Sequence, residues 1–135
     1  MAYKIVDIQG IGPAYAEKLI AAGIETVDQL LEAGKTSKGR KELEEKTGIS
    51  GKFILTWVNH ADLFRIKGVG PQFAELLEAS GVDTVKEFGH GVAANLVAKM
   101  QEVNEQKHLT KVVPTEAQVQ AMIDQAKELP GVVTY

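Results

Sequence analysis

The sequence predicts an all-α protein built from an internal repeat. Residues 8–24 (IQGIGPAYAEKLIAAGI) align without a gap on residues 66–82 (IKGVGPQFAELLEASGV), and nine of the seventeen positions are identical. Signals for the start and end of helices recur along the whole chain, and no stretch shows the sustained alternation of apolar and polar residues that is typical of strands. Self-similarity over this length predicts a duplicated helical unit.

Each copy of the repeat begins a helix at a proline. Pro13 and Pro71 follow a Gly-x-Gly turn, and proline is favoured in the first turn of a helix because the amide it lacks would have no partner there. Thr26, Thr84 and Thr115 each precede Gln or Glu by three residues, as in a capping box. Four glycines at expected helix ends predict left-handed caps: Gly23, Gly34, Gly48 and Gly81. The expected helices are 13–22, 26–33, 38–47, 51–63, 71–80, 85–88, 93–106 and 116–129.

Apolar spacing predicts which helical faces are buried. One face gathers Tyr15, Ala16, Leu19 and Ile20, and another gathers Phe53, Ile54, Trp57, Val58 and Ala61. We expect Trp57 to belong to the core, the alternative being a stacking platform for single-stranded nucleic acid.

The second half of the repeat is fainter and suggests how the chain closes. Residues 50–61 align on 115–126 at an offset of 65, so that Trp57 coincides with Met122 and the second copy carries an insertion in the region 104–114. Helix 116–129 is therefore the equivalent of helix 51–63, which precedes the second glycine turn. We expect it to pack beside the first glycine turn, with these residues in contact: Val119, Met122, Ile123 and Ala126.

The organisation expected from the repeat is a single domain, 1–135, with pseudo-two-fold symmetry. Its two units are 1–63 and 64–135. In a chain of 135 residues such a domain buries about two-thirds of the surface of the unfolded chain.

The composition excludes several classes of protein. The absence of cysteine excludes disulfides and cysteine-ligated metal sites, and no apolar run reaches the ~20 residues of a membrane span. A cytoplasmic location without membrane contact is expected. The net charge of −3 is unlike that of a dedicated DNA binder, although Lys35, Lys38, Arg40 and Lys41 form a run without an acid. This run is either a solvated helix start or a supporting contact for DNA.

The glycine turns resemble the helix-hairpin-helix motif. Gly10-Ile11-Gly12 and Gly68-Val69-Gly70 match its core, and each is followed by a helix that ends at Gly-Ile or Gly-Val. The tandem arrangement also resembles an uncharacterised bacterial domain-of-unknown-function family of tandem helix-hairpin-helix proteins. The motif implies sequence-independent binding of the DNA backbone, because the amides of the turn and of the following helix form an anion site. The implied phosphate contacts are the backbone groups of Gly10, Ile11, Gly12, Gly68, Val69 and Gly70.

We call residues 8–12 hairpin 1 and residues 66–70 hairpin 2. Arg65 and Lys67 flank hairpin 2, whereas Asp7 and Gln9 occupy the matching positions of hairpin 1. The expected DNA-binding side chains are Arg65, Lys67, Lys38, Arg40 and Lys41, while Lys4 and Lys127, distant from both hairpins in sequence, should matter less. The alternative is that the hairpins only join packed helices, and that the chain is a protein-interaction or self-assembly module, possibly filament-forming, whose oligomers would use the C-terminal helix.

Other chemistry finds little support in the sequence. Residues 41–61 weakly resemble a helix-turn-helix, whose second helix would offer Lys52, Thr56, Asn59 and His60 to base edges. The three histidines lie on separate elements and are expected at the surface rather than at a metal. No nucleophile–base set, P-loop or dinucleotide fingerprint occurs, so we expect neither an enzyme nor a cofactor.

Overall fold

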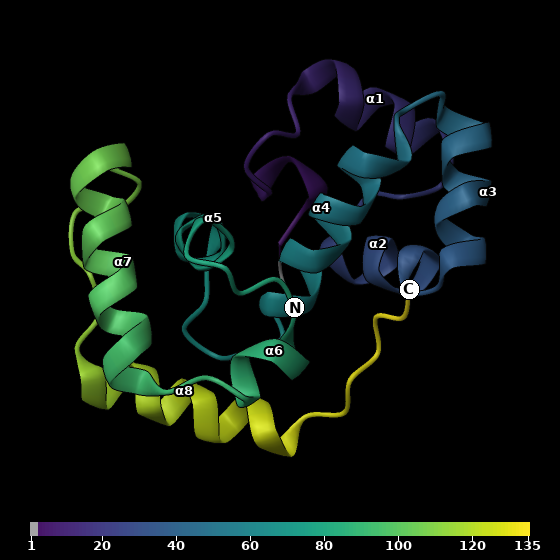
Figure 1. The fold of residues 1–135 in the computed structure, drawn as a ribbon. Coiled ribbons are helices and arrows are strands. Elements are labelled where there is room, and N and C mark those ends of the chain that lie inside the picture. The colour runs from purple at the N-terminus through teal and green to yellow at the C-terminus, as the bar shows by residue number, and fades with distance from the viewer. Residues whose placement is uncertain (1–2) are drawn as a thin grey trace. The chain divides into compact units, whose positions relative to one another are not determined.

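Helices carry all the regular secondary structure of residues 3–135, which the computed structural model describes (Figure 1). The prediction of an all-α fold is confirmed. The eight α-helices of this part of the chain are α1 (Pro13–Ala21), α2 (Val27–Gly34), α3 (Ser37–Thr47), α4 (Gly51–Leu63), α5 (Pro71–Ala79), α6 (Val85–Gly89), α7 (Ala93–Lys107) and α8 (Glu116–Glu128). None of these helices combines the length and the apolar character that crossing a membrane requires.

The helices begin and end largely where the sequence signals lie. Thr26 and Thr115 form the expected capping boxes at the starts of α2 and α8, and the Thr84 hydroxyl accepts the Glu87 amide at the start of α6. Gly23, Gly48 and Gly81 have positive φ at the ends of α1, α3 and α5. Thr36, which the sequence analysis did not single out, caps α3 through the amide of Gly39. Local capping chemistry therefore sets most helix boundaries.

The expectation for Gly34 is wrong. It is the last residue of α2, and its φ is not positive. A Cβ at this position would lie 2.5 Å from Cγ2 of Val58, so glycine allows α4 to approach α2 closely. A close helix crossing, which one sequence does not reveal, is the reason for glycine here.

The chain divides into two compact units, with the boundary at the end of α4. Unit 1 comprises the described residues up to Asp62 together with Val132–Tyr135, and unit 2 comprises Leu63–Gly131. Unit 1 contains α1, α2, α3 and nearly all of α4, preceded by a 3₁₀ helix, η1 (Ile5–Asp7), that the sequence did not predict. An isolated bridge between Lys4 and Thr26 ties this first segment to the start of α2.

Unit 2 repeats the same order of helices, with α5 to α8 in place of α1 to α4. In Figure 1, α8 runs along the ends of α6 and α7. The inner side of α8 contributes Val119, Ile123 and Ala126 to the core. The connection before α8 is longer than its counterpart, because residues 108–115 replace the three residues 48–50.

The prediction that helix 116–129 packs beside hairpin 1 is wrong. α8 lies in unit 2, where Cε of Met122 is 3.1 Å from the position that a Cβ at Gly68 would take. In unit 1 it is α4 that supports the hairpin, because Nε1 of Trp57 lies 3.5 Å from the corresponding position at Gly10. The equivalence of Trp57 and Met122 holds, but each helix packs on the hairpin that precedes it in its own unit. A helix connected to its hairpin through one unit closes a shorter loop, which costs less entropy.

The packed faces match the apolar pattern except at its margins. Trp57 is 3% exposed and belongs to the core, as predicted. Ile20 and Phe53, expected on buried faces, are 49% and 46% exposed. Each lies at the edge of its apolar stripe, where helical spacing alone does not separate buried from exposed positions.

Candidate nucleic-acid interface

Both hairpins have the same backbone conformation. Gly10 and Gly68 have φ of +93° and +96°, values that side chains rarely adopt. Each turn is closed by one backbone bond: the Ile11 amide donates to the Ile8 carbonyl at 3.2 Å, and the Val69 amide donates to the Ile66 carbonyl at 3.1 Å. The apolar residue in the middle of each turn is buried and anchors it.

The second glycine of each hairpin begins a helix without a capping side chain. Gly12 and Gly70 are the N-cap residues of α1 and α5, and both have extended backbone with negative φ. Proline follows each of them, and the first intrahelical bonds are accepted by the Gly12 and Gly70 carbonyls. Threonine hydroxyls cap α2, α3, α6 and α8 in the same chain. α7 also begins without a side-chain cap, at Val92, so the two hairpin helices differ from the four threonine-capped helices but share this feature with α7.

Several backbone amides at the starts of α1 and α5 have no acceptor within the described chain and are available to a ligand. Within residues 3–135, the amides of Gly12 and Ala14 donate to no acceptor, and neither do those of Gly70 and Gln72. Gly12, Ala14 and Gln72 are exposed, so water or an anion can reach them. Such amides, with the positive end of the helix dipole behind them, favour an anion.

Gly12 has no visible structural reason to be glycine. Its φ of −83° suits any residue, and a Cβ added there would meet no heavy atom of the described chain within 4 Å. A side chain at this position would, however, stand where a group from outside approaches the amides. Gly68, by contrast, combines a positive φ with the close approach of Met122, while the φ of Gly70 is −107°.

Cations gather at hairpin 2 rather than at hairpin 1, as the sequence indicated. The Lys67 side chain is exposed, while its amide donates to Oε1 of Gln125 at 2.7 Å and so fixes hairpin 2 on α8. Arg65 is half-buried, and its Nη2 donates to the Pro130 carbonyl at 2.6 Å. Arg65 thus has a structural bond, and Lys67 is the more accessible cation.

Lys127 lies in the same unit as hairpin 2 but packs on another part of it. Gln125, two residues earlier on α8, accepts the Lys67 amide, whereas the backbone of Lys127 lies close to Gly89 at the end of α6. That Lys127 matters less for binding than the residues beside the hairpins stays a prediction.

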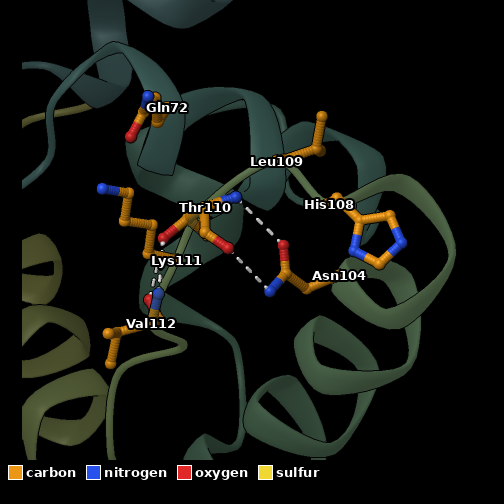
Figure 2. A pocket seen from close by; sticks show the side chains of 7 residues that line it. All are labelled: Gln72, Asn104, His108, Leu109, Thr110, Lys111 and Val112. Carbon is orange, nitrogen blue, oxygen red and sulfur yellow. Dashed lines mark hydrogen bonds between the residues drawn. The ribbon is translucent and has the colours of Figure 1, made fainter.

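The insertion of unit 2 forms a pocket of about 650 Å³ beside the start of α5 (Figure 2). The Asn104 side chain holds the loop by donating to the Thr110 carbonyl and accepting its amide, both at 3.0 Å. In Figure 2 the Lys111 side chain extends from this loop toward Gln72, the second residue of α5. The pocket lining includes Lys111 and His108 but no carboxylate. The insertion thus adds a cation next to the free amides of hairpin 2.

The basic run of unit 1 is only partly accessible. Arg40 is 8% exposed, and its Nη1 and Nη2 donate to the carbonyls of Gly34 at 2.9 Å and Thr134 at 2.6 Å. Burial lowers the pKa of Arg40 and the Tyr135 side chain opposes this change, while the guanidinium stays charged at neutral pH. Arg40 therefore serves the fold of unit 1, and Lys38 and Lys41 remain exposed.

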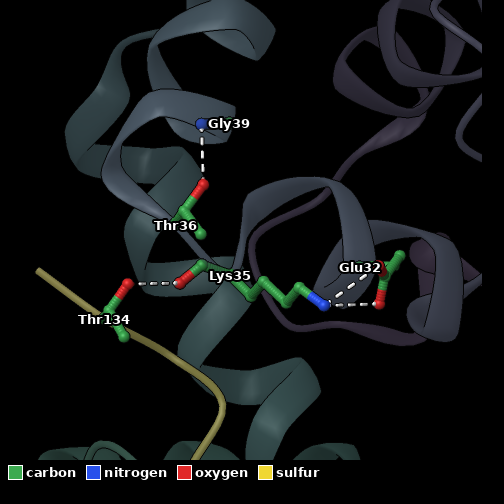
Figure 3. A network of polar contacts seen from close by, with 5 residues as sticks. All are labelled: Glu32, Lys35, Thr36, Gly39 and Thr134. Carbon is green, nitrogen blue, oxygen red and sulfur yellow. Dashed lines mark hydrogen bonds and ion pairs between the residues drawn. The ribbon is translucent and has the colours of Figure 1, made fainter.

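The C-terminal segment packs on unit 1 beside Arg40, whose Nη2 donates to the Thr134 carbonyl. Figure 3 shows Thr134 next to Lys35. The Thr134 amide donates to the Lys35 carbonyl at 2.8 Å, and the Lys35 ammonium pairs with Glu32 at 3.0 Å. The Tyr135 ring lies 5.7 Å from the Arg40 guanidinium carbon. These contacts could not be predicted from the sequence, because residues 132–135 show no helical or strand pattern.

The weak helix-turn-helix reading of residues 41–61 does not fit the structure. Asn59 and His60 are buried, so they cannot present polar groups to base edges. His60 is also not the surface residue that we expected, although His90 and His108 are exposed. Within residues 3–135 no three side chains of the metal-ligating types come together.

Comparison with known proteins places the chain in a family but adds no function. A family model described as "Domain of unknown function (DUF4332)" matches residues 9–129. That range covers hairpin 2, all of hairpin 1 except its first residue, and all eight α-helices of the described chain, the last of which ends at Glu128. Neither the curated proteins nor the solved structures include a match.

Proposed function

Because the chain belongs to the DUF4332 family, whose description assigns no activity, we propose a function from its own geometry: it is a non-catalytic module that binds the phosphate backbone of DNA through its two glycine hairpins. The observation that carries this proposal is the pair of uncapped helix starts at Gly12 and Gly70. Capping would satisfy these amides within the chain, whereas glycine leaves them for phosphate oxygens.

Hairpin 2 is the stronger half of the proposed interface. Lys67 is exposed next to it, and Lys111 lies in the pocket beside the first turn of α5. Lys38 and Lys41 add exposed positive charge in unit 1, where hairpin 1 has no flanking cation. With so few cations and a net charge of −3, binding should be weak, and it should fall as salt rises with a slope set by the number of phosphates that the lysines neutralise.

The contacts proposed here carry no sequence information. Backbone amides and lysines meet phosphate oxygens, which are the same for every base pair. The buried Asn59 and His60 leave α4 without a polar face for base edges. The tandem helix-hairpin-helix resemblance supports the same reading.

Capping variants at position 12 test the proposal. Gly12→Asn and Gly12→Asp supply a side-chain cap of nearly equal shape, so both should keep or raise the stability of α1. Both should bind a DNA duplex more weakly than the parent, because the new side chain accepts hydrogen bonds from the amides that would otherwise donate to phosphate. The loss of DNA affinity in Gly12→Asp should exceed that in Gly12→Asn by at least about fivefold, since repulsion between a carboxylate and a nearby phosphate costs ~1 kcal/mol even in water.

The measurement is a fluorescence titration of a short duplex at low salt and at a series of higher salt concentrations. Lys67→Ala should weaken binding and flatten the salt slope by about one unit. Ala14→Gly is the matched control at hairpin 1, because it changes the first turn without adding a cap. If both position-12 variants bind as the parent does, hairpin 1 is not a contact.

A self-assembly module is the second candidate, and it has an observation of its own. Val6 and Ile20 are about half exposed and line one groove of unit 1, at 50% and 49%. Lys4 and Glu25 stand at the same groove and would pair across a two-fold contact between copies. Concentration-dependent sedimentation that disappears in Ile20→Gln would favour this function.

A further inference from the structure

We propose that unit 2 holds a second anion site, a pocket for a phosphate group between α6 and the C-terminal end of α8. The pocket has a volume of about 270 Å³ and is lined by Lys86, His90 and Lys127, with Gly89, Leu129 and Gly131 among the other lining residues. None of its lining residues belongs to hairpin 1 or hairpin 2. The inference therefore stands without the proposed function.

The charge of this pocket is unusual for its surroundings. Residues 68–135 contain nine acidic and five basic residues, yet two of the five bases line this pocket and none of the acids does. His90 adds a third side chain able to donate a hydrogen bond. Like charges at one pocket repel each other unless an anion lies between them.

Glycine brings these side chains together. Gly89 is buried at the end of α6, and a Cβ there would lie 3.4 Å from the Lys127 amide nitrogen and 3.5 Å from its Cα. A Cβ at Gly131 would lie 3.7 Å from Cβ of Lys86. The chain after α8 thus returns to α6, and Lys86 and Lys127 come from helices that pack directly on each other.

Arg65 contributes to the same end of unit 2. Its Nη2 binds the Pro130 carbonyl, between the lining residues Leu129 and Gly131. The segment that closes the pocket is therefore held in place by a cation from the approach to hairpin 2. Helix dipoles alone explain a single cation at the end of a helix. They do not explain why two lysines and a histidine from two elements share one pocket.

A phosphate group is the ligand that this lining suits best. Lysine binds phosphate as a point charge, and a phosphate oxygen accepts from lysine and histidine donors alike. The volume accommodates a phosphate with a small substituent. The same chemistry occurs in a nucleic-acid backbone and in a free phosphate compound, and the experiment separates these sources.

The test follows backbone amide resonances of the full chain during titration with inorganic phosphate at constant ionic strength, set with sodium chloride. The expected result is a saturable shift at His90, Lys127 and Gly131. In the Lys86→Gln/Lys127→Gln variant the dissociation constant should rise at least about tenfold. Lys46→Gln/Lys99→Gln is the matched control, because both residues are exposed on other helices and the charge change is the same.

A second arm repeats the comparison with a DNA duplex. A larger loss of DNA affinity in the pocket variant than in the control variant identifies the backbone as the source of the phosphate. Equal DNA affinity, with the phosphate response lost, identifies a free phosphate compound. Shifts that chloride reproduces, or that persist in the pocket variant, would overturn the site. Phosphate binding by a chain that does not bind DNA would refute only the proposed function.

Discussion

The two hairpins share a backbone and differ in what supports and surrounds it. Hairpin 1 rests on Trp57, whose ring lies 5.2 Å from that of Tyr15 and 6.1 Å from that of Phe53. Hairpin 2 rests on Met122, which is only half-buried, and it has an exposed lysine at its flank. Hairpin 1 thus has a rigid aromatic support, whereas hairpin 2 has a flexible support and more positive charge. We infer that unit 1 contributes more to stability and unit 2 more to binding.

The largest difference should appear when the supports are removed. Trp57→Ala should lower the free energy of unfolding by about 3–5 kcal/mol, because a buried aromatic side chain leaves a large cavity. Met122→Ala should cost less, about 1–2 kcal/mol, because a half-buried side chain leaves a smaller one. Urea denaturation followed by circular dichroism measures both. Equal losses would remove the distinction between the two supports.

A smaller effect separates the two kinds of glycine. Gly68→Ala should cost about 1–2 kcal/mol, because the residue has positive φ and its Cβ would crowd Met122. Gly12→Ala lacks both costs and should lose only the difference between glycine and alanine at an N-cap, at most about 1 kcal/mol. Combining Gly68→Ala with Met122→Ala should recover the part that is due to crowding. A full loss in the double variant would assign the cost to backbone conformation alone.

A third contrast concerns the two arginines that bind backbone carbonyls near the C-terminus. Arg40 is buried and donates to two carbonyls, so Arg40→Gln should cost about 2 kcal/mol of unfolding free energy. Arg65 is more exposed and donates to Pro130, so Arg65→Gln should cost under about 1 kcal/mol. Thermal unfolding by calorimetry compares them. DNA affinity should change in the opposite order, with the larger loss at Arg65.

Short-range sequence signals predicted the positions of the helices but not the contacts between distant parts of the chain. Prolines, threonine caps and the spacing of Trp57 identified the helices because these effects act within a few residues. The pairing of α8 with hairpin 2 was missed, although the Trp57–Met122 equivalence was correct, because an alignment does not tell which hairpin a helix approaches. The burial of Arg40 was missed for the same reason, because its partner Thr134 lies far away in the sequence.

The candidate site shows a similar division. The glycine hairpins and the cations at hairpin 2 were visible in the sequence, since a repeat marks its own shared positions. Two other features could be seen only in the structure. Gly12 has open space around it, and α1 and α5 begin without a side chain that caps their first amides. Glycine occurs at an N-cap for several reasons, and only the structure distinguishes a glycine that allows close packing from one that leaves the helix amides accessible.

The central claim, that uncapped amides at the two hairpins receive DNA phosphates, is tested most directly by amide resonances during titration with a short duplex. We predict that the largest shifts fall at Gly12, Ala14, Gly70 and Gln72, with those of unit 2 larger than those of unit 1. The shifts should disappear as salt rises and should not depend on duplex sequence. Shifts confined to other surfaces, with these four amides unchanged, would contradict the account.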